Sequence, residues 1–235
     1  PNIRYAITPR DNTTRQILDL IRATPGPGIV YAQTRAGTER LAEALAVTGR
    51  PVRAYHAGLE PAVRAANQAA FVASEDMVIC ATVAFGMGID KPDVRFVAHA
   101  GLPKSIEAYY QETGRAGRDG DPAVAHLFWG AEDFARARQR IAEVDDRRQP
   151  GERARLNALG ALVETAGCRR RILLRHFGEE PPESCGNSGV SRTAPSRGVA
   201  GAPFIVTASG SFCCVSAWAA RSIHPFSWVV VYSTR

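Results

Sequence analysis

Short apolar runs alternate with amphipathic segments from Ile3 to Val144. The apolar runs, each of strand length, are Ile3–Ile7, Gly28–Tyr31, Val52–Tyr55, Met77–Ala81, Arg95–His99 and Val124–Trp129. The segments between them are candidate helices and lie at Thr13–Ala23, Gly37–Val47, Pro61–Val72, Ser105–Thr113 and Ala131–Glu143. This alternation predicts an α/β fold with a mostly parallel sheet flanked by helices.

The loops that follow the predicted strands are the expected place for chemistry. Asn12 or Thr13 can cap the first predicted helix, and Pro61 stands where a first helical position tolerates proline. In parallel sheets, ligands bind beyond the carboxyl ends of the strands. The segments expected there carry glycine, threonine and arginine, and they are Gln33–Thr38, His56–Leu59, Thr82–Pro92 and Gly101–Lys104.

A second region follows the predicted sheet. Asp145–Gly151 is charged and closes on Pro-Gly, which indicates a linker. Glu152–Ala166 and Arg169–Phe177 then have helical patterns and predict a hairpin of two helices that carries several arginines. The predicted organisation is a domain over residues 1–146, a small helical hairpin over 147–187, and an unassigned tail over 188–235.

The composition changes abruptly near the end of the chain. From Ser184 to Arg235 there is no Asp, Glu or Lys. Ala202–Ala220 is uncharged, but its serines, threonine and glycine make it a weak membrane span, so we expect no membrane partner. The change favours the hypothesis that the tail is an out-of-frame or otherwise aberrant translation, and we expect it to be poorly ordered.

Charge and cysteine content bear on the binding partners and the cellular location of the protein. The chain has 235 residues and a formal net charge of +6, and Lys91 and Lys104 are its only lysines. This excess is compatible with a nucleic-acid partner, and equally with an arginine-favouring genome. Five cysteines without regular spacing do not suggest a disulfide framework, which favours a reducing, cytoplasmic location. No signal peptide is recognisable, and because the sequence opens without methionine we expect a fragment or a processed product.

The stretch Gln111–Gly120, QETGRAGRDG, concentrates the candidate chemistry. It places Arg115 and Arg118 three residues apart among three glycines, and if the helix predicted from Ser105 continues this far, both guanidinium groups lie on one face. Glycine lets a ligand approach the backbone, and guanidinium suits bidentate phosphate recognition. The stretch predicts a site that stabilises charge on a transferring phosphoryl group, and the plainer alternative is an Arg/Gly-rich surface turn.

Four stretches together resemble RecQ-family DNA helicases, in the order seen there: Gly28–Ala36, Ala54–Leu59, Ala81–Val97 and Tyr109–Gly120. In that family such stretches form motifs IV, V and VI of the second RecA-like domain, so the resemblance implies a RecA-like parallel sheet. Leu156–Gly160 and Cys168–Gly178 resemble the helical part of the family's zinc-binding domain. The resemblance covers about Asn2–Asn187.

The resemblance implies roles in ATP hydrolysis. Arg118 matches the arginine finger, which would reach the γ-phosphate of ATP held, with Mg²⁺, mainly by another domain. Arg115 and Gln111 match partners that bind phosphate or couple it to movement of the motifs. Gly88 and Asp90 would line the same interdomain cleft.

The resemblance also implies contacts with DNA. Thr82, Arg35 and His56 would face the strand, where hydroxyl groups and arginines contact phosphates without reading the sequence. The plainer alternatives are that His56 is a structural histidine and that Thr82 caps the following turn. Phe85 and Met87 are expected to pack in the core or at a hinge rather than to touch DNA.

The sequence departs from the family pattern in two ways, which affect ATP hydrolysis and zinc binding. Its only lysines follow Asp90 and Pro103, so it has no Gly-Lys-Ser/Thr phosphate-binding loop, and it also lacks an acidic Mg²⁺-binding motif. We therefore expect that the chain alone does not hydrolyse ATP and that it needs an N-terminal RecA-like domain.

The zinc ligands are the second departure. Cys168 and Cys185 match ligands of the family, whereas Ser188 and Ser191 stand where the other two thiolates belong. Serine is a poor zinc ligand because its hydroxyl does not ionise as a thiol does. We expect no tight zinc, or a weak and incomplete site.

Three hypotheses for function follow. The first is the C-terminal motor half of an ATP-dependent 3′→5′ DNA helicase acting in recombination and repair. The second is a non-catalytic fragment that binds nucleic acid or a partner protein. The third is an RNA helicase of the related DEAD-box kind. The residues of Ala81–Val97 and Tyr109–Gly120 resemble those of DNA helicases more closely, so this hypothesis is less favoured.

Overall fold

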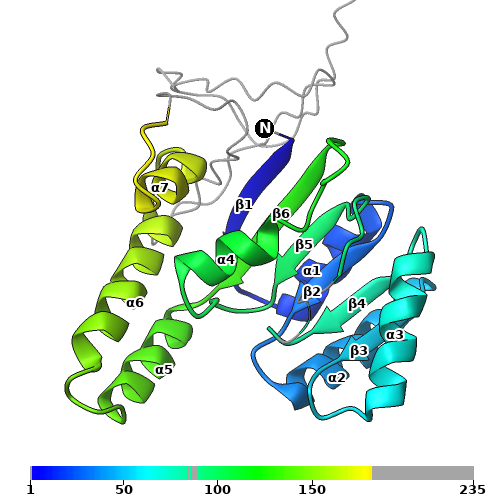
Figure 1. Ribbon diagram of the computed structural model, residues 1–235, viewed down its shortest axis with the longest axis horizontal. Coiled ribbons are helices and arrows are strands. Elements are labelled where there is room, and N and C mark those ends of the chain that lie inside the picture. The colour runs from blue at the N-terminus through cyan, green and yellow to red at the C-terminus, as the bar shows by residue number, and fades with distance from the viewer. Residues whose placement is uncertain (1, 84, 86–88, 182–235) are drawn as a thin grey trace, which may run out of the picture. The chain divides into compact units, whose positions relative to one another are not determined.

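Six parallel strands form the central sheet of the described part of the chain, which comprises residues 2–83, 85 and 89–181 of the computed structural model (Figure 1). The strands are β1 (Ile3–Pro9), β2 (Gly28–Tyr31), β3 (Val52–Tyr55), β4 (Val78–Ala81), β5 (Phe96–His99) and β6 (Ala123–Trp129). Their order across the sheet is β1-β6-β5-β2-β4-β3, and every neighbouring pair is parallel. The predicted α/β fold with a parallel sheet is confirmed.

Helices connect the strands and continue beyond the last one. They are α1 (Thr13–Ala23), α2 (Arg35–Leu45), α3 (Pro61–Ala73), α4 (Ile106–Thr113), α5 (Ala131–Ala142), α6 (Gln149–Glu164) and α7 (Arg169–His176), with a short 3-10 turn, η1, at Ala46–Thr48. Asn12 caps α1, because its side-chain oxygen accepts a hydrogen bond of 3.0 Å from the Arg15 amide. Pro61 stands at the start of α3, as predicted.

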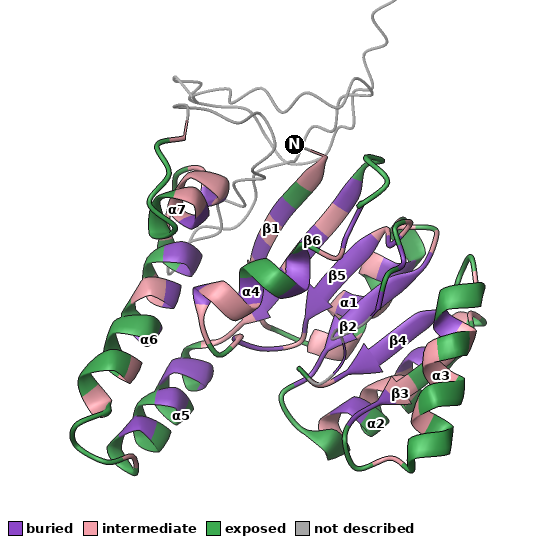
Figure 2. Cartoon of the chain, in the orientation of Figure 1, coloured by how far each residue is buried: buried purple, intermediate pink, exposed green. Residues whose placement is uncertain are grey.

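The sheet is covered on both faces, so its central strands are buried from end to end (Figure 2). Successive residues of a strand point to opposite faces. Val30, Cys80 and Ala98 pack on one face against Ile17 of α1 and Leu45 of α2. The opposite face packs against α3 and α4, which explains why β2 and β4 are apolar at every position.

The hairpin of α6 and α7 packs against the edge of the same sheet. Leu159 and Leu162 of α6 and Leu173 of α7 share one core with Tyr5 of β1 and Ile106 of α4. The two predicted helices are therefore present, and α4 is packed between the sheet and the hairpin.

The prediction of a linker is wrong for the C-terminal part of the segment. Asp145–Gly151 was expected to be irregular, but α6 already begins at Gln149. Proline is tolerated in the first turn of a helix, where its missing amide hydrogen has no helical partner to lose. The predicted domain boundary at residue 146 stays a prediction, and the predicted tail of residues 188–235 lies outside the described residues. None of the described helices is both long and apolar enough to cross a membrane.

Candidate functional site

The carboxyl ends of four strands form one edge of the sheet. The register pairs Tyr31 at the end of β2 with His99 on one side and with Ala81 on the other, and Ala81 is paired with Tyr55. Because all strands run in the same direction, the residues that follow these positions lie along this edge. They include Thr82, so the predicted site loops after β2, β3 and β4 do come together.

Arg35 and His56 lie close to each other at this edge. His56 is 3% exposed, its Nε2 is 3.0 Å from the Glu39 carboxylate, and its Nδ1 accepts a hydrogen bond of 3.2 Å from the Gly58 amide. A side-chain carbon at Gly58 would lie 3.1 Å from Arg35 and 3.2 Å from His56, so both side chains border this glycine. His56 has a partner at each ring nitrogen, whereas Arg35 is exposed.

A cavity of about 110 Å³ opens beside Thr82. Its wall includes Gln33 from the end of β2, His99 from β5 and Glu112 from α4. The Gln33 amide donates a hydrogen bond of 2.9 Å to the Leu102 carbonyl, which holds the loop after β5 in place. Thr82 is thus brought next to side chains from two other strands and from α4.

The helix that precedes the two arginines ends at Thr113, as predicted, and does not continue to Arg115 and Arg118. α4 stops at Thr113, and Gly114 forms its C-cap. Arg115 and Arg118 therefore lie in the turn that follows, so the condition under which one helical face would carry both is not met. The glycines explain the break, because Gly117 has φ +57°, a backbone conformation that favours glycine. Arg115 is half-buried, whereas the side chain of Arg118 is 43% exposed.

Arg118 is only weakly held. Its Nη1 lies 3.4 Å from the Asp90 carboxylate, whose side chain is 89% exposed, and its Nε donates to the Gly114 carbonyl at 3.3 Å. An exposed ion pair of this length contributes little free energy, so Arg118 can leave Asp90 at small cost. Gln111 is exposed on α4, and Gly88 lies outside the described residues.

Three buried polar side chains, Tyr31, His99 and Glu112, form what we call the inner cluster, and Arg115 interacts with its Tyr31. The Tyr31 ring stacks on His99 with centroids 5.2 Å apart, and the Tyr31 hydroxyl donates to the Phe85 carbonyl at 3.1 Å. His99 Nε2 lies 2.6 Å from a Glu112 carboxylate oxygen. Burial raises the pKa of Tyr31, and the charge of the neighbouring Arg115 acts in the opposite direction. Arg115 Nε is buried and has no hydrogen-bond partner in the described part of the chain.

Sequence reasoning missed the inner cluster, although one signal was present. Glu112 falls three residues after Tyr109 and six after Ile106, on the side of α4 that packs in the core. A carboxylate on an apolar helix face requires a buried partner. Phe85, in contrast, is 1% exposed and packs in the core as predicted, while Met87 lies outside the described residues.

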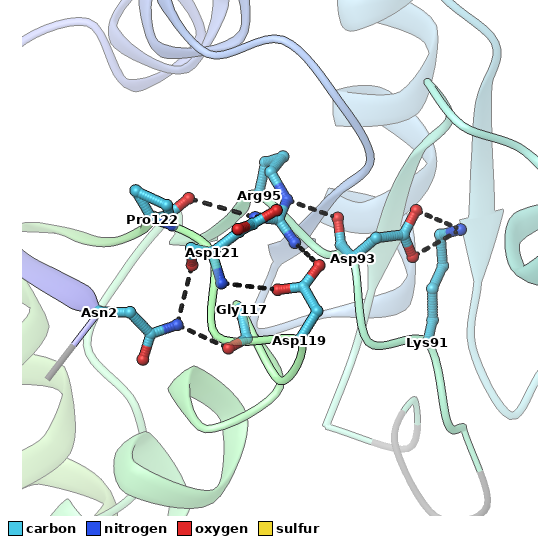
Figure 3. Close-up of polar contacts among 8 residues, drawn as sticks. All are labelled: Asn2, Lys91, Asp93, Arg95, Gly117, Asp119, Asp121 and Pro122. Carbon is cyan, nitrogen blue, oxygen red and sulfur yellow. Dashed lines mark hydrogen bonds and ion pairs between the residues drawn. The ribbon is translucent and has the colours of Figure 1, made fainter.

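The turn of residues 114–120, which we call the arginine turn, is fixed by Arg95 and Asn2 (Figure 3). The Arg95 guanidinium pairs with the Asp119 carboxylate. The Asn2 amide donates to the Gly117 carbonyl at 2.6 Å and to the Asp121 carbonyl at 2.8 Å. The turn is therefore joined both to β1 and to the segment that enters β5, so the arginines project from a rigid support.

The zinc ligands suggested by the sequence are not assembled in the described part. Cys168 stands at the start of α7, while Cys185, Ser188 and Ser191 lie outside the described residues. Among the described residues, no group of three His, Cys, Asp or Glu side chains could hold a metal ion. The described residues thus supply one of the thiols that zinc would need.

Two family matches account for most of this architecture. Residues 12–120 match the family described as helicase conserved C-terminal domain, and residues 131–188 match the RecQ zinc-binding family. The chain belongs to the RecQ family. The resemblance predicted from the motifs is confirmed, and this RecQ chain carries the family's C-terminal helicase domain together with its zinc-binding region.

Named relatives agree with this assignment. The ATP-dependent DNA helicase RecQ of Haemophilus influenzae is 43% identical over 199 residues, which are 84% of this chain and 32% of that protein. The RecQ-like DNA helicase blm-1 of Caenorhabditis elegans is 41% identical over 198 residues, which are 80% of this chain and 20% of that protein. The chain thus spans about a third or less of the length of these relatives.

A solved structure supports the fold alone. The Mss116p DEAD-box helicase domain 2 bound to an RNA duplex superimposes with a TM-score of 0.51 at 20% identity. The match covers 59% of this chain and 58% of that one. The RecA-like architecture is therefore shared beyond the RecQ family.

Proposed function

We propose that this chain is the C-terminal motor half of an ATP-dependent 3′→5′ DNA helicase that unwinds DNA in recombination and repair. The observation that carries the proposal is the turn of residues 114–120, which carries two arginines and is fixed to Asn2 and to the segment that enters β5. Arg118 is held by a 3.4 Å contact with an exposed carboxylate and by one long hydrogen bond to the Gly114 carbonyl, and Arg115 keeps a buried donor without a partner in the described part. Both guanidinium groups could therefore donate hydrogen bonds to a phosphate.

Phosphoryl transfer explains why two arginines would be needed. Negative charge spreads over the γ-phosphate oxygens in the transition state, and a guanidinium group placed there lowers the barrier. Arg118 would leave Asp90 and reach the γ-phosphate of ATP bound, with Mg²⁺, on the N-terminal RecA-like domain. Arg115, with its guanidinium fixed against Tyr31, would bind phosphate from the side. Gln111 and Asp90 would line the same cleft, as would Gly88.

DNA would bind along the edge of the sheet that is formed by the carboxyl ends of β2, β3, β4 and β5. The Thr82 hydroxyl and the exposed Arg35 guanidinium are suited to contact phosphates, which gives affinity without sequence preference. His56 would act beneath them, because its bonds to Glu39 and Gly58 hold the loop over which Arg35 lies. DNA contacts and arginines on one rigid domain allow closure of the cleft to move the strand.

The proposal is tested by supplying the missing nucleotide-binding part. In a chimera, this chain replaces the matching third of Haemophilus influenzae RecQ, and ATP hydrolysis is measured with and without single-stranded DNA. We expect DNA-stimulated hydrolysis by the chimera and none by this chain alone. Loss of hydrolysis in the chimera, with DNA binding by the chain intact, would support the non-catalytic fragment instead. Equal stimulation by RNA would favour the DEAD-box-like alternative.

A further inference from the structure

The buried contact between His99 and Glu112 is not explained by the motifs that surround it. Their side chains are 2% and 10% exposed, and the Glu112 carboxylate oxygen lies 2.6 Å from His99 Nε2. Burying a carboxylate and an imidazole costs desolvation free energy, and an apolar pair of similar size often gives equal or greater stability. His99 Nδ1 is also buried without a hydrogen-bond partner in the described part of the chain. Stability alone is therefore a poor reason for this pair.

The geometry connects the pair to Arg115 by two routes. Along the chain, Glu112 lies three residues before Arg115, at the last turn of α4. Through space, the Tyr31 ring stacks on His99 at an interplanar angle of 24°, and the charges of Arg115 and Glu112 both act on the Tyr31 hydroxyl. Fixing the His99 ring therefore fixes the Tyr31 ring, and with it the surface against which Arg115 lies.

The same pair also forms part of the cavity beside Thr82. His99 and Glu112 both line it, together with Gln33 and Tyr31. The Tyr31 hydroxyl reaches the carbonyl of Phe85, three residues beyond Thr82. The pair thus lies between the edge where we propose DNA to bind and the arginine that we propose to bind phosphate.

We propose that His99 and Glu112 are positioning residues for Arg115, acting through Tyr31. This inference rests on the function proposed above. His99 donates from Nε2 to Glu112, which fixes the ring on which Tyr31 stacks. The Tyr31 hydroxyl, anchored on the Phe85 carbonyl, then sets where the Arg115 guanidinium lies. An occupant of the cavity would press on the same rings, so DNA at this edge and the position of Arg115 are coupled.

The first experiment compares variants of the chimera in DNA-stimulated ATP hydrolysis. His99→Leu removes the donor to Glu112, and we expect kcat to fall roughly 10- to 100-fold, the size of effect that follows from misplacing a reacting group. KM for ATP should stay near the parent value. His99→Gln keeps a donor near Nε2 and should restore most of kcat. His126→Leu is the matched control, since His126 is a partly buried histidine on β6 bonded to Thr8 at 2.8 Å, away from the cavity.

A double-mutant cycle separates positioning from a structural role. If His99 acts through Arg115, His99→Leu should lower kcat little further in an Arg115→Lys background, because coupled residues are not additive. Full additivity, or an unchanged kcat in His99→Leu, would overturn the inference while leaving the proposed function standing. A parent chimera that hydrolyses no ATP would overturn both. Thermal unfolding of each variant confirms that kcat is measured on folded protein.

Discussion

Helix α4 carries two glutamate–histidine contacts that differ in one respect. At its amino end, Glu107 lies 2.7 Å from His176 of α7, and the two side chains are 45% and 28% exposed. At its carboxyl end, Glu112 lies 2.6 Å from His99 of β5, and the side chains are 10% and 2% exposed. The distances are nearly equal, so burial alone distinguishes the outer contact from the inner one.

Because they differ in burial, the two contacts contribute differently to the structure. Water screens the outer contact and competes for both partners, so it contributes little to the free energy of folding. The inner contact has no such competition, and each partner depends on the other for a hydrogen bond. The outer contact joins the hairpin to α4, whereas the inner one fixes the end of α4 that leads into the arginine turn.

Breaking each contact by the same substitution should change the free energy of unfolding by very different amounts. Glu112→Ala leaves His99 buried without its partner and should lower the free energy of unfolding by about 3 kcal/mol. Glu107→Ala should lower it by less than about 1 kcal/mol. Urea unfolding of the two variants measures both values. Equal losses would show that burial does not separate the two contacts.

The turn beyond the inner contact should be nearly as sensitive. Gly117→Ala places a carbon 2.5 Å from Asn2 Nδ2 and 2.7 Å from the Asp121 carbonyl, at a φ of +57°. We expect a loss of about 2 kcal/mol, together with slower ATP hydrolysis by the chimera. Gly120→Ala is the control, because its φ of +92° is strained but no atom lies within 4 Å. If the two alanines cost the same, the packing around Gly117 does not hold the turn.

Replacing both His99 and Glu112 separates their effect on the stability of the protein from their effect on the position of Arg115. The double variant His99→Leu with Glu112→Leu buries no unpaired polar group, so it should lose only about 1 kcal/mol, less than Glu112→Ala alone. Its kcat in the chimera should nevertheless stay low, because Tyr31 has lost its oriented neighbour. Denaturant unfolding and ATP hydrolysis on the same samples provide the comparison. Recovery of both stability and kcat would assign the pair a packing role only.

The smallest effect concerns pH and the outer contact. The Ser105 hydroxyl and His176 lower the pKa of Glu107 from 4.5 to about 2. Its contribution to stability is therefore present above the unfolded pKa and is lost as pH falls towards the folded one. Glu107→Gln should be slightly less stable than the parent at about pH 6, and the difference should shrink by about pH 3. Glu164→Gln, an exposed change on α6, should show no such dependence.

The sequence predicted the scaffold well and the inner cluster poorly. Gly28–Tyr31 and Val52–Tyr55 are strands as expected, because short apolar runs between amphipathic helices usually form the buried strands of an α/β domain. The motifs also located the arginine turn. His99 and Glu112 were missed because their partnership joins β5 to α4 across the packing of the sheet, and periodicity carries no information about such a contact. The helix end at Thr113 was predicted correctly, and Arg115 and Arg118 share no helical face because Gly114 and Gly117 keep the helix from continuing.

The proposed function requires this chain to supply the arginine that completes an ATP site on another domain. The most direct test is the rate of ATP hydrolysis by the chimera with Arg118→Ala, at saturating ATP and single-stranded DNA. We predict that kcat falls roughly 10³-fold or more, the range known for removal of such an arginine, while DNA affinity and folding are retained. Hydrolysis at the parent rate would contradict the claim, because Arg118 would then take no part in phosphoryl transfer.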